Sequence, residues 1–246
     1  MPASWNIIVS TARSDGHYDH PDLPVPLALR RVTGARSLRL RYDANRNLLK
    51  LTCPVRTSPK AALRWAGQQR AWVDAQLAAT PPAEPFVPGA TIPFEGREIL
   101  LLWDAPASRR ALFDGDVLRC GGPLEGFARR IESALRAAAR DRLSSETAEI
   151  AARAGVTVLA VTLGDADTRW GSCSASGRIR YNWRLILAPP AVRRWVVAHE
   201  VAHRRHMNHG PAFKAHEAEL FDGDVDQSRR LLRRLGPRLK RIGRGL

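Results

Sequence analysis

Three residues towards the C-terminal end of the chain, His199, Glu200 and His203, form the pattern HExxH. On a helix, residues i and i+4 lie one turn apart and project the same way, so both imidazoles can place a nitrogen about 2 Å from one zinc ion. Glu200 lies beside them, where it can take the proton of a metal-activated water and return it to a leaving amine. The motif therefore predicts a zinc-dependent hydrolase of peptide bonds, with Glu200 as general base and acid.

A catalytic zinc ion needs a third protein ligand, and five of the seven histidines belong to this same short segment. His209 has the spacing of the third histidine in HExxHxxGxxH sites. That geometry requires the helix to end, and the Gly210-Pro211 pair favours a break near 208–210. We therefore expect His209 to be the third ligand. His206 is the alternative if the helix continues. His216 is a further histidine of the segment, and Glu217 and Glu219 are more distant candidates.

The elements around the motif are predicted from apolar spacing. The Pro189-Pro190 pair and an apolar stripe predict a buried helix that carries HExxH. Before it we expect strands in 156–164, 168–174 and 178–188. The order of the last strand and the HExxH helix resembles that of zincins, which implies an edge strand that pairs with an extended substrate. A long helix over 123–154, ended by Gly155, precedes these strands.

The first half of the chain is predicted to be rich in strands. Alternating residues over 36–53 indicate a hairpin around an Asn-containing turn, with Leu38, Leu40 and Tyr42 on one face. Ser58-Pro59 starts a helix that runs to about Ala79. A proline-rich connector follows over 80–93, and then strands over 97–103 and 111–120, the second broken by Asp114-Gly115.

The expected organisation is a poorly determined lead-in over 1–35, a β-rich subdomain with one helix over 36–119, and a catalytic domain with a basic tail over 120–246. A chain of 246 residues is long enough for one large or two small domains. The fold class is predicted to be α+β.

Several runs carry a family resemblance. They are TRWGSCS from Thr168, YNWRLILAPP from Tyr181, VAHEVAH from Val197 and MNHGPAF from Met207. Together they resemble the YgjP-like zinc metallopeptidase family, which is related to the SprT-like and WLM proteases. The weaker pattern over 36–119 also fits that family.

The resemblance implies a zincin-like core in which His199, His203 and His209 hold one Zn²⁺ per chain and Glu200 is the catalytic acid and base. The sequence departs from the family pattern at two positions, where Val201 replaces a leucine and Lys214 replaces an aromatic residue. The second departure leaves open how the helix after the third ligand packs.

The same runs contain other reactive side chains. Cys173 has no nearby partner cysteine and is expected to be a small buried residue rather than a ligand. Gly171 is expected to permit a close backbone approach. Tyr181 or His216 is a candidate for stabilising an oxyanion, and the sequence does not rank them.

The net positive charge of the chain suggests a function other than hydrolysis. The 39 Lys and Arg residues exceed the 24 Asp and Glu residues by 15, and the excess is carried by arginine. Such a surplus attracts polyanions, either nucleic acid or an anionic membrane surface, although compositional bias alone can produce it. The second hypothesis is a nucleic-acid-associated binding protein with a structural or vestigial zinc site, and a DNA-associated protease would combine both. The basic C-terminal tail from Arg229 onward is expected to form an amphipathic helix that stops at Gly236-Pro237.

Cellular context follows from what the sequence lacks. Three widely spaced cysteines indicate no disulfide framework, and no long apolar run or leader-like start is found. We expect a cytoplasmic protein with no transmembrane segment. The oligomeric state and the substrate-binding residues are not predicted.

Overall fold

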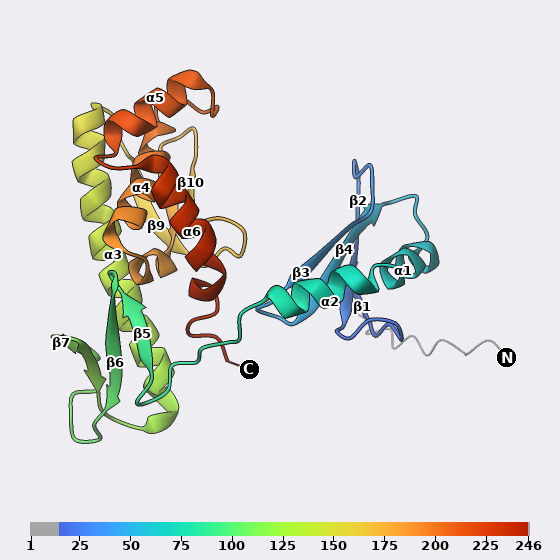
Figure 1. Cartoon of the computed structure of the whole chain (residues 1–246), viewed down its shortest axis with the longest axis horizontal. Coiled ribbons are helices and arrows are strands. Elements are labelled where there is room, and N and C mark those ends of the chain that lie inside the picture. The colour runs from blue at the N-terminus through green and yellow to red at the C-terminus, as the bar shows by residue number, and fades with distance from the viewer. Residues whose placement is uncertain (1–14, 246) are drawn as a thin grey trace. The chain divides into compact units, whose positions relative to one another are not determined.

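The computed structural model describes residues 15–245, which form two compact units that divide between Pro81 and Pro82 (Figure 1). Both units combine helices and strands, so the predicted α+β class is confirmed. The division expected at 119/120 differs from this boundary, which falls within the proline-rich connector. The strands that follow the connector share a core with the long helix after them and therefore belong to the second unit.

The first unit is built on a four-stranded sheet in the order β1-β2-β4-β3. Its strands are β1 (Asp15–Tyr18), β2 (Leu27–Val32), β3 (Arg39–Asp43) and β4 (Leu48–Pro54). The antiparallel pair β3 and β4 confirms the predicted hairpin, and its turn contains Asn47 in the left-handed region at φ 48°. Two strands thus arise within the segment expected to be a lead-in, of which residues 1–14 lie outside the described part.

The single helix expected over 59–79 is two helices, α1 (Pro59–Gly67) and α2 (Arg70–Ala79). Ser58 caps the first as predicted, its Oγ accepting from the backbone N–H of Ala61 at 3.2 Å. The break follows Gly67, where a Cβ atom would lie 2.5 Å from the ring of His20. A glycine packed against a side chain in this way weakens the helix at that point.

The second unit begins with a four-stranded sheet in the order β5-β6-β8-β7. Its strands are β5 (Thr91–Phe94), β6 (Arg97–Trp103), β7 (Leu112–Asp114) and β8 (Val117–Cys120). The last three confirm both predicted strand regions, whereas β5 begins within the segment expected to be a connector. After a 3₁₀ turn η1 (Leu124–Gly126), α3 (Phe127–Ala154) runs along the unit from this sheet to the helices that follow (Figure 1). Gly155 ends it at φ 62°, as predicted.

The second sheet of this unit corrects two expectations. Its strands are β9 (Ala160–Gly164), β10 (Gly171–Cys173) and β11 (Arg178–Asn182), in the order β10-β11-β9. The strand expected at the edge, β11, is therefore central, because β9 pairs with it in parallel on its other side, and β10 is an edge strand. After Asn182 the chain forms the 3₁₀ helix η2 (Trp183–Leu187), since the Asn182 side chain accepts from the N–H of Arg184 at 2.9 Å.

Three helices complete the unit: α4 (Pro190–Ala202), α5 (Pro211–Leu220) and α6 (Val225–Leu239). The expected stop of α6 at Gly236-Pro237 is wrong, because Pro237 lies inside the helix. Gly236 packs against Trp170, where a Cβ would lie 3.1 Å from the ring, and Arg238 pairs with Glu84 at 2.8 Å. None of the helices formed by the described residues combines the length and apolar character that crossing a membrane requires.

A buried ion pair joins α3 to α4. Arg193 is 2% exposed and donates to Glu146 at 2.8 Å, and it also lies 3.1 Å from Glu95. The next residue of α4, Arg194, is partly exposed and pairs at 2.7 Å with Glu149, which lies three residues after Glu146 on α3. The two pairs thus provide a buried and an exposed version of one contact.

Removing the buried carboxylate is expected to lower the free energy of unfolding more than removing the exposed one. The substitution Glu146→Ala leaves the Arg193 guanidinium buried with one carboxylate fewer, and we expect the free energy of unfolding to fall by about 3 kcal/mol. The control Glu149→Ala should cost about 1 kcal/mol or less. Urea denaturation of the two variants measures both values, and equal losses would contradict the assigned difference in burial.

Candidate metal centre

The HExxH motif lies in the last turn of α4. Pro190 occupies the first turn of that helix, and nearly every side chain after it is buried, which confirms the predicted buried helix. The helix ends at Ala202, with His203 as its C-cap, rather than near 208–210 as expected. Contacts to distant segments hold the turn that follows: Arg204 donates to the backbone oxygen of Thr157 at 3.1 Å and Arg205 donates to that of Ala154 at 2.5 Å.

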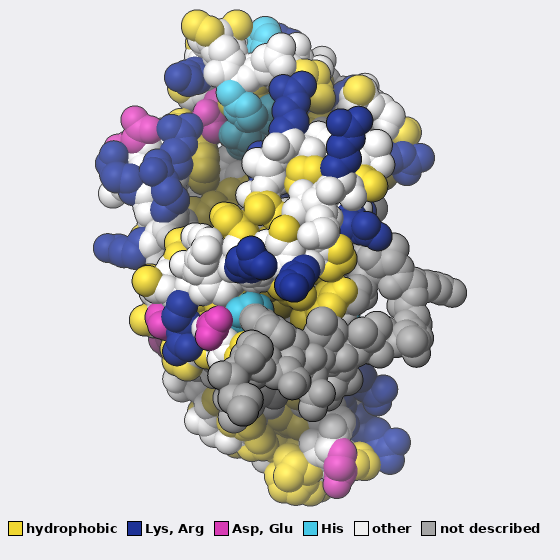
Figure 2. Space-filling view, turned by 90° about the vertical axis from the view of Figure 1, so that its right-hand side faces the viewer, with side chains coloured by type: hydrophobic (Ala, Val, Ile, Leu, Met, Phe, Trp, Pro, Cys, Tyr) yellow, Lys and Arg dark blue, Asp and Glu magenta, His cyan; other side chains and the backbone are white. Residues whose placement is uncertain are grey.

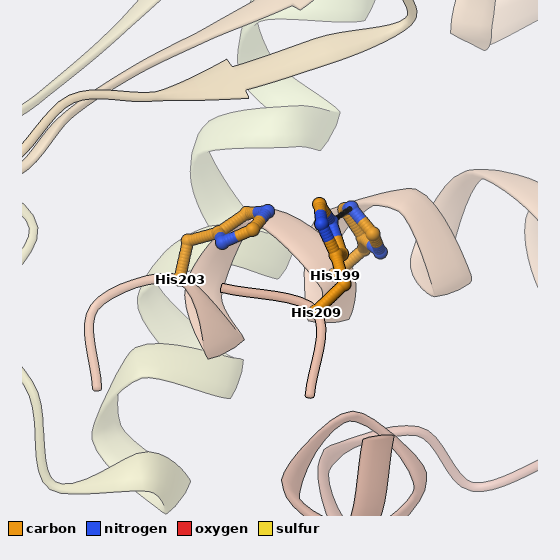
Figure 3. Close-up of side chains that lie close together, drawn as sticks. All are labelled: His199, His203 and His209. Atoms are coloured by element: carbon orange, nitrogen blue, oxygen red, sulfur yellow. Dashed lines mark hydrogen bonds between the residues drawn. The ribbon is translucent and has the colours of Figure 1, made fainter. Parts of the chain in front are cut away.

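Because the helix ends there, the chain turns back and brings a third imidazole to the motif. His199, His203 and His209 lie together, each offering one ligand atom, and these atoms are all within 4.8 Å of one another. The Nε2 atoms of His199 and His209 are 3.2 Å apart (Figure 3). The ring of His206, the alternative third ligand, is not part of this group.

The other ring nitrogens of two of these histidines are already engaged. His199 Nδ1 lies 2.8 Å from Oε1 of Glu217, and His203 Nδ1 lies 3.1 Å from the backbone oxygen of His206. Both acceptors require a proton on Nδ1, which leaves Nε2 of each ring without a proton and able to bind a metal. Burial and the neighbouring His199 and His209 lower the pKa of His203, although the bond to His206 opposes this, and the neutral ring is the form that ligates.

The donor set fits a zinc ion. Nitrogen ligands about 2.0–2.1 Å from a tetrahedral zinc lie roughly 3.4 Å from one another. The spacing of 3.2 Å between the His199 and His209 nitrogens is close to this value, and the third nitrogen lies within 4.8 Å. Three neutral imidazoles with a free coordination position are a ligand set typical of catalytic zinc.

Glu217 accepts a hydrogen bond from the outer ring nitrogen, Nδ1, of His199. It is 1% exposed, and besides His199 it accepts from the indole N–H of Trp195 at 2.9 Å and lies 3.6 Å from Arg229. Burial alone would raise the pKa of Glu217, but these hydrogen bonds and the positive charge of Arg229 hold it below its ordinary value. Glu217 is therefore an ionised carboxylate that fixes the tautomer and orientation of His199.

Phe213 forms the floor under the three imidazoles. It is 1% exposed, and its ring centroid lies 5.0 Å from that of His199, 4.6 Å from His203 and 4.7 Å from His209. Phe213 and Glu217 are four residues apart on α5 and so present one face to the site. The neighbouring departure from the family pattern, Lys214, points to solvent and leaves this packing intact.

Glu200 lies against the edge strand β10. A Cβ atom added to Gly171 would stand 2.3 Å from Glu200 Oε1, so this glycine permits the close approach that its sequence context suggested. The carboxyl is 5% exposed and makes no hydrogen bond to any described residue. Burial raises the pKa of Glu200 to about 7, against the opposing charges of His199 and Arg169. A carboxyl of this pKa can both accept and release a proton near neutrality.

The other candidate side chains do not reach this centre. Tyr181 is 1% exposed and its hydroxyl lies 3.0 Å from that of Thr147 in the core, where burial raises its pKa. His216 faces Glu219 at 3.3 Å. Cys173 is half-buried, burial raises the pKa of its thiol, and it is not among the grouped ligand atoms.

The site combines three features: a helix that carries HExxH, a third histidine that a loop brings back to it, and a carboxylate that contacts the first histidine. Metal-dependent hydrolases use sites of this kind. Comparison with known families agrees with this class. The model of the YgjP-like family, described as a metallopeptidase domain, matches residues 36–235, and the chain belongs to that family. It is therefore a metallopeptidase, a hydrolase whose family implies a metal. No curated protein and no solved structure gives a significant match.

Sequence reasoning missed two roles in this centre. Glu217 was expected only as a distant ligand, and its contact with His199 Nδ1 was not foreseen. Phe213 was noted only as part of a motif. One signal was available: the two residues are four apart after Gly210-Pro211, so a helix starting there would place both on one face.

Loss of the Glu217 carboxylate is expected to weaken metal binding. In the variant Glu217→Gln the anionic acceptor behind His199 becomes neutral, and we expect zinc affinity to fall by roughly 10–100-fold. Competition with a chromophoric zinc chelator measures this. The control is Glu219→Gln, since Glu219 is exposed on the same helix. Affinities equal to wild type in both variants would contradict the role assigned to Glu217.

Proposed function

We propose that the protein is a zinc-dependent peptidase in which His199, His203 and His209 hold one Zn²⁺ and Glu200 moves the proton. The observation that carries this proposal is the convergence of the three imidazoles, whose ligand atoms lie within 4.8 Å of one another, while the outer nitrogens of His199 and His203 are engaged by Glu217 and the His206 carbonyl. Side chains already held in the ligating orientation lose little freedom when a metal binds.

When bound there, zinc lowers the pKa of a water molecule and polarises the substrate carbonyl. Glu200 is the group placed to accept a proton, since its carboxyl is buried and makes no hydrogen bond to the described residues. It then delivers that proton to the leaving amine. Close packing on Gly171 fixes the carboxyl beside the edge strand β10.

The edge of β10 is suited to hold the substrate backbone. It is the outer strand of its sheet and pairs only with β11 among the described strands, so one side of its backbone is open to an added strand. An extended polypeptide bound there would pass next to Glu200, because Gly171 belongs to this strand. The expected substrate is therefore a segment of polypeptide in extended conformation.

The test is hydrolysis of a proteome-derived peptide mixture, followed by mass spectrometry of new termini. We expect cleavage by the zinc-restored protein and none by protein stripped of metal with a chelator. Equal cleavage with and without zinc would contradict the proposal, as would the absence of cleavage by protein that carries one zinc per chain.

Helix α6 supports nucleic-acid binding as a second candidate function. Arg230, Arg233 and Arg234 are exposed on one side of it, and no acidic residue within the described range pairs with them. On the face drawn in Figure 2, Lys and Arg side chains occur in several separate groups. Three unpaired cations at helical spacing are suited to phosphate contacts.

If α6 binds a phosphate backbone, replacing its three free arginines changes the salt dependence. We expect wild-type protein to bind duplex DNA with an affinity that falls as salt rises, and the triple variant Arg230→Gln, Arg233→Gln, Arg234→Gln to lose roughly 3 units of the log–log salt slope. Fluorescence anisotropy over a salt series measures it, and Glu200→Gln should behave as wild type. A triple variant with an unchanged slope would remove α6 from any nucleic-acid interface.

A further inference from the structure

A pocket of about 280 Å³ lies at the end of the second sheet of the larger unit. Its walls come from the loop between β9 and β10 and from the last residues of β11. The side chains that decide its chemistry are Asp165, Arg169, Trp170 and Arg180. We call it the Arg169–Arg180 pocket.

The pocket carries uncompensated positive charge. Arg169 and Arg180 are exposed, and within residues 15–245 neither has a hydrogen-bond or ion-pair partner for its guanidinium. The one acidic residue in the wall, Asp165, is already neutralised, because one of its oxygens accepts from Arg184 and the other accepts from Arg244 at 2.7 Å. An anion entering the pocket would therefore meet two free guanidinium groups.

Gly164 lets the Arg180 side chain lie close to the backbone of β9. A Cβ atom added to Gly164 would stand 2.4 Å from Arg180 Nε, so the guanidinium rests on the end of β9. The indole of Trp170 supplies an apolar wall and is held by Gly236 on one side and by the Lys240 ammonium at 4.8 Å. An apolar wall beside two guanidinium groups matches a short aliphatic stem that ends in a carboxylate.

The pocket adjoins the catalytic carboxyl. Gly171 lines it and is also the residue against which Glu200 packs, a Cβ there standing 2.3 Å from Glu200 Oε1. Arg169 is near enough for its charge to act on Glu200. A polypeptide that crosses the site beside β10 would thus carry one of its side chains past the pocket within a residue or two of the bond at Glu200, because side chains alternate along an extended chain.

We propose that the Arg169–Arg180 pocket binds an Asp or Glu side chain of the polypeptide substrate close to the scissile bond. This rests on the proposed peptidase function and adds a substrate class to it. A nucleic-acid strand fits less well, because it needs cations repeated along a groove, and here the two free arginines line a single pocket.

The experiment compares the cleavage preferences of four zinc-loaded proteins on a proteome-derived peptide mixture. They are wild type, the double variant Arg169→Gln/Arg180→Gln, the single variant Arg178→Gln, and Glu200→Gln as the inactive blank. Arg178 is an exposed arginine on the same strand as Arg180 and does not line the pocket, so it is the matched control for charge. Zinc content and thermal unfolding of each variant check that the fold is kept.

For wild type and Arg178→Gln we expect Asp and Glu to be enriched at one fixed position relative to the cleaved bond. For synthetic peptides that differ only by Asp or Asn at that position, kcat/KM should favour Asp by roughly 10-fold or more. In the double variant this ratio should fall to about 1. Both peptides are compared on the same enzyme, so the lost effect of the Arg169 charge on Glu200 does not enter the ratio.

Different failures are distinguishable. Cleavage by wild type without any acidic preference, or a preference that survives in the double variant, overturns the inference and leaves the peptidase function standing. If a single-stranded oligonucleotide competes with the Asp peptide for wild type and not for the double variant, the pocket is a phosphate site and the inference is wrong. No cleavage of any peptide by zinc-loaded wild type contradicts the peptidase function and removes the inference with it.

Discussion

Replacing Glu200 with Gln is expected to leave about one zinc per chain in place while kcat falls by roughly 10²–10⁴-fold. Gln has the same shape, so it can keep the packing against Gly171 of β10. It cannot accept a proton as the carboxylate does. Because the three grouped ligand atoms belong to His199, His203 and His209, loss of the Glu200 charge should spare the metal.

The two quantities are measured on the same samples, zinc by elemental mass spectrometry and turnover with a cleavable peptide. Glu149→Gln is a suitable control, because it makes the same charge change at an exposed site on α3. Full turnover in Glu200→Gln would contradict its role as the proton carrier. Loss of zinc from that variant would mean that Glu200 helps to hold the metal.

Replacing His209 with Ala is expected to weaken zinc binding by more than about 100-fold, beyond the effect typical of an outer hydrogen-bonding partner. Two histidines of α4 would remain, and the third nitrogen, 3.2 Å from that of His199, would be missing. The matched control is His206→Ala. It removes the alternative ligand while keeping the backbone oxygen that His203 Nδ1 contacts at 3.1 Å.

Chelator competition gives both affinities. We expect His206→Ala to bind zinc as wild type does, and His209→Ala to be purified with little zinc. The opposite order would show that the loop after α4 rearranges when metal binds and that His206 is the third ligand.

The chemistry of α4 could be predicted from the sequence because it depends on local spacing. Two histidines one helical turn apart share a face wherever the helix is placed, and a glutamate beside them follows with it. The paired prolines at 189 and 190 and the apolar stripe then fixed the helix and its burial. The predicted hairpin and the stop at Gly155 are equally local, since each depends on a turn or cap residue in the left-handed region.

The third ligand depended on where that helix ends, and this is a tertiary property. Nothing in residues 203–209 forbids another helical turn, which would have brought His206 to the face of His199. In the fold this turn is replaced by a loop, which Arg204 and Arg205 hold by donating to carbonyls of distant segments. The motif spacing favoured His209 on the expectation that the helix breaks near 208–210, whereas α4 ends at Ala202.

The remaining errors share this origin. Strand β11 is central because it pairs in parallel with β9, and no residue of β11 indicates this pairing. A Gly-Pro pair usually ends a helix, yet α6 continues through Gly236-Pro237 because Trp170 fits against the glycine and Glu84 holds Arg238. Long-range pairing and packing decided these cases, and local propensity did not.

X-ray absorption at the zinc edge of the metal-loaded chain tests the central claim most directly, because it counts the ligands of the ion. We predict three imidazole nitrogens at about 2.0–2.1 Å with one further light atom, as His199, His203 and His209 require. A sulfur at about 2.3 Å would add a cysteine to the ligand set, and fewer than three imidazoles would remove one of the three histidines from it. Either result would contradict the three-histidine centre on which the proposed peptidase activity rests.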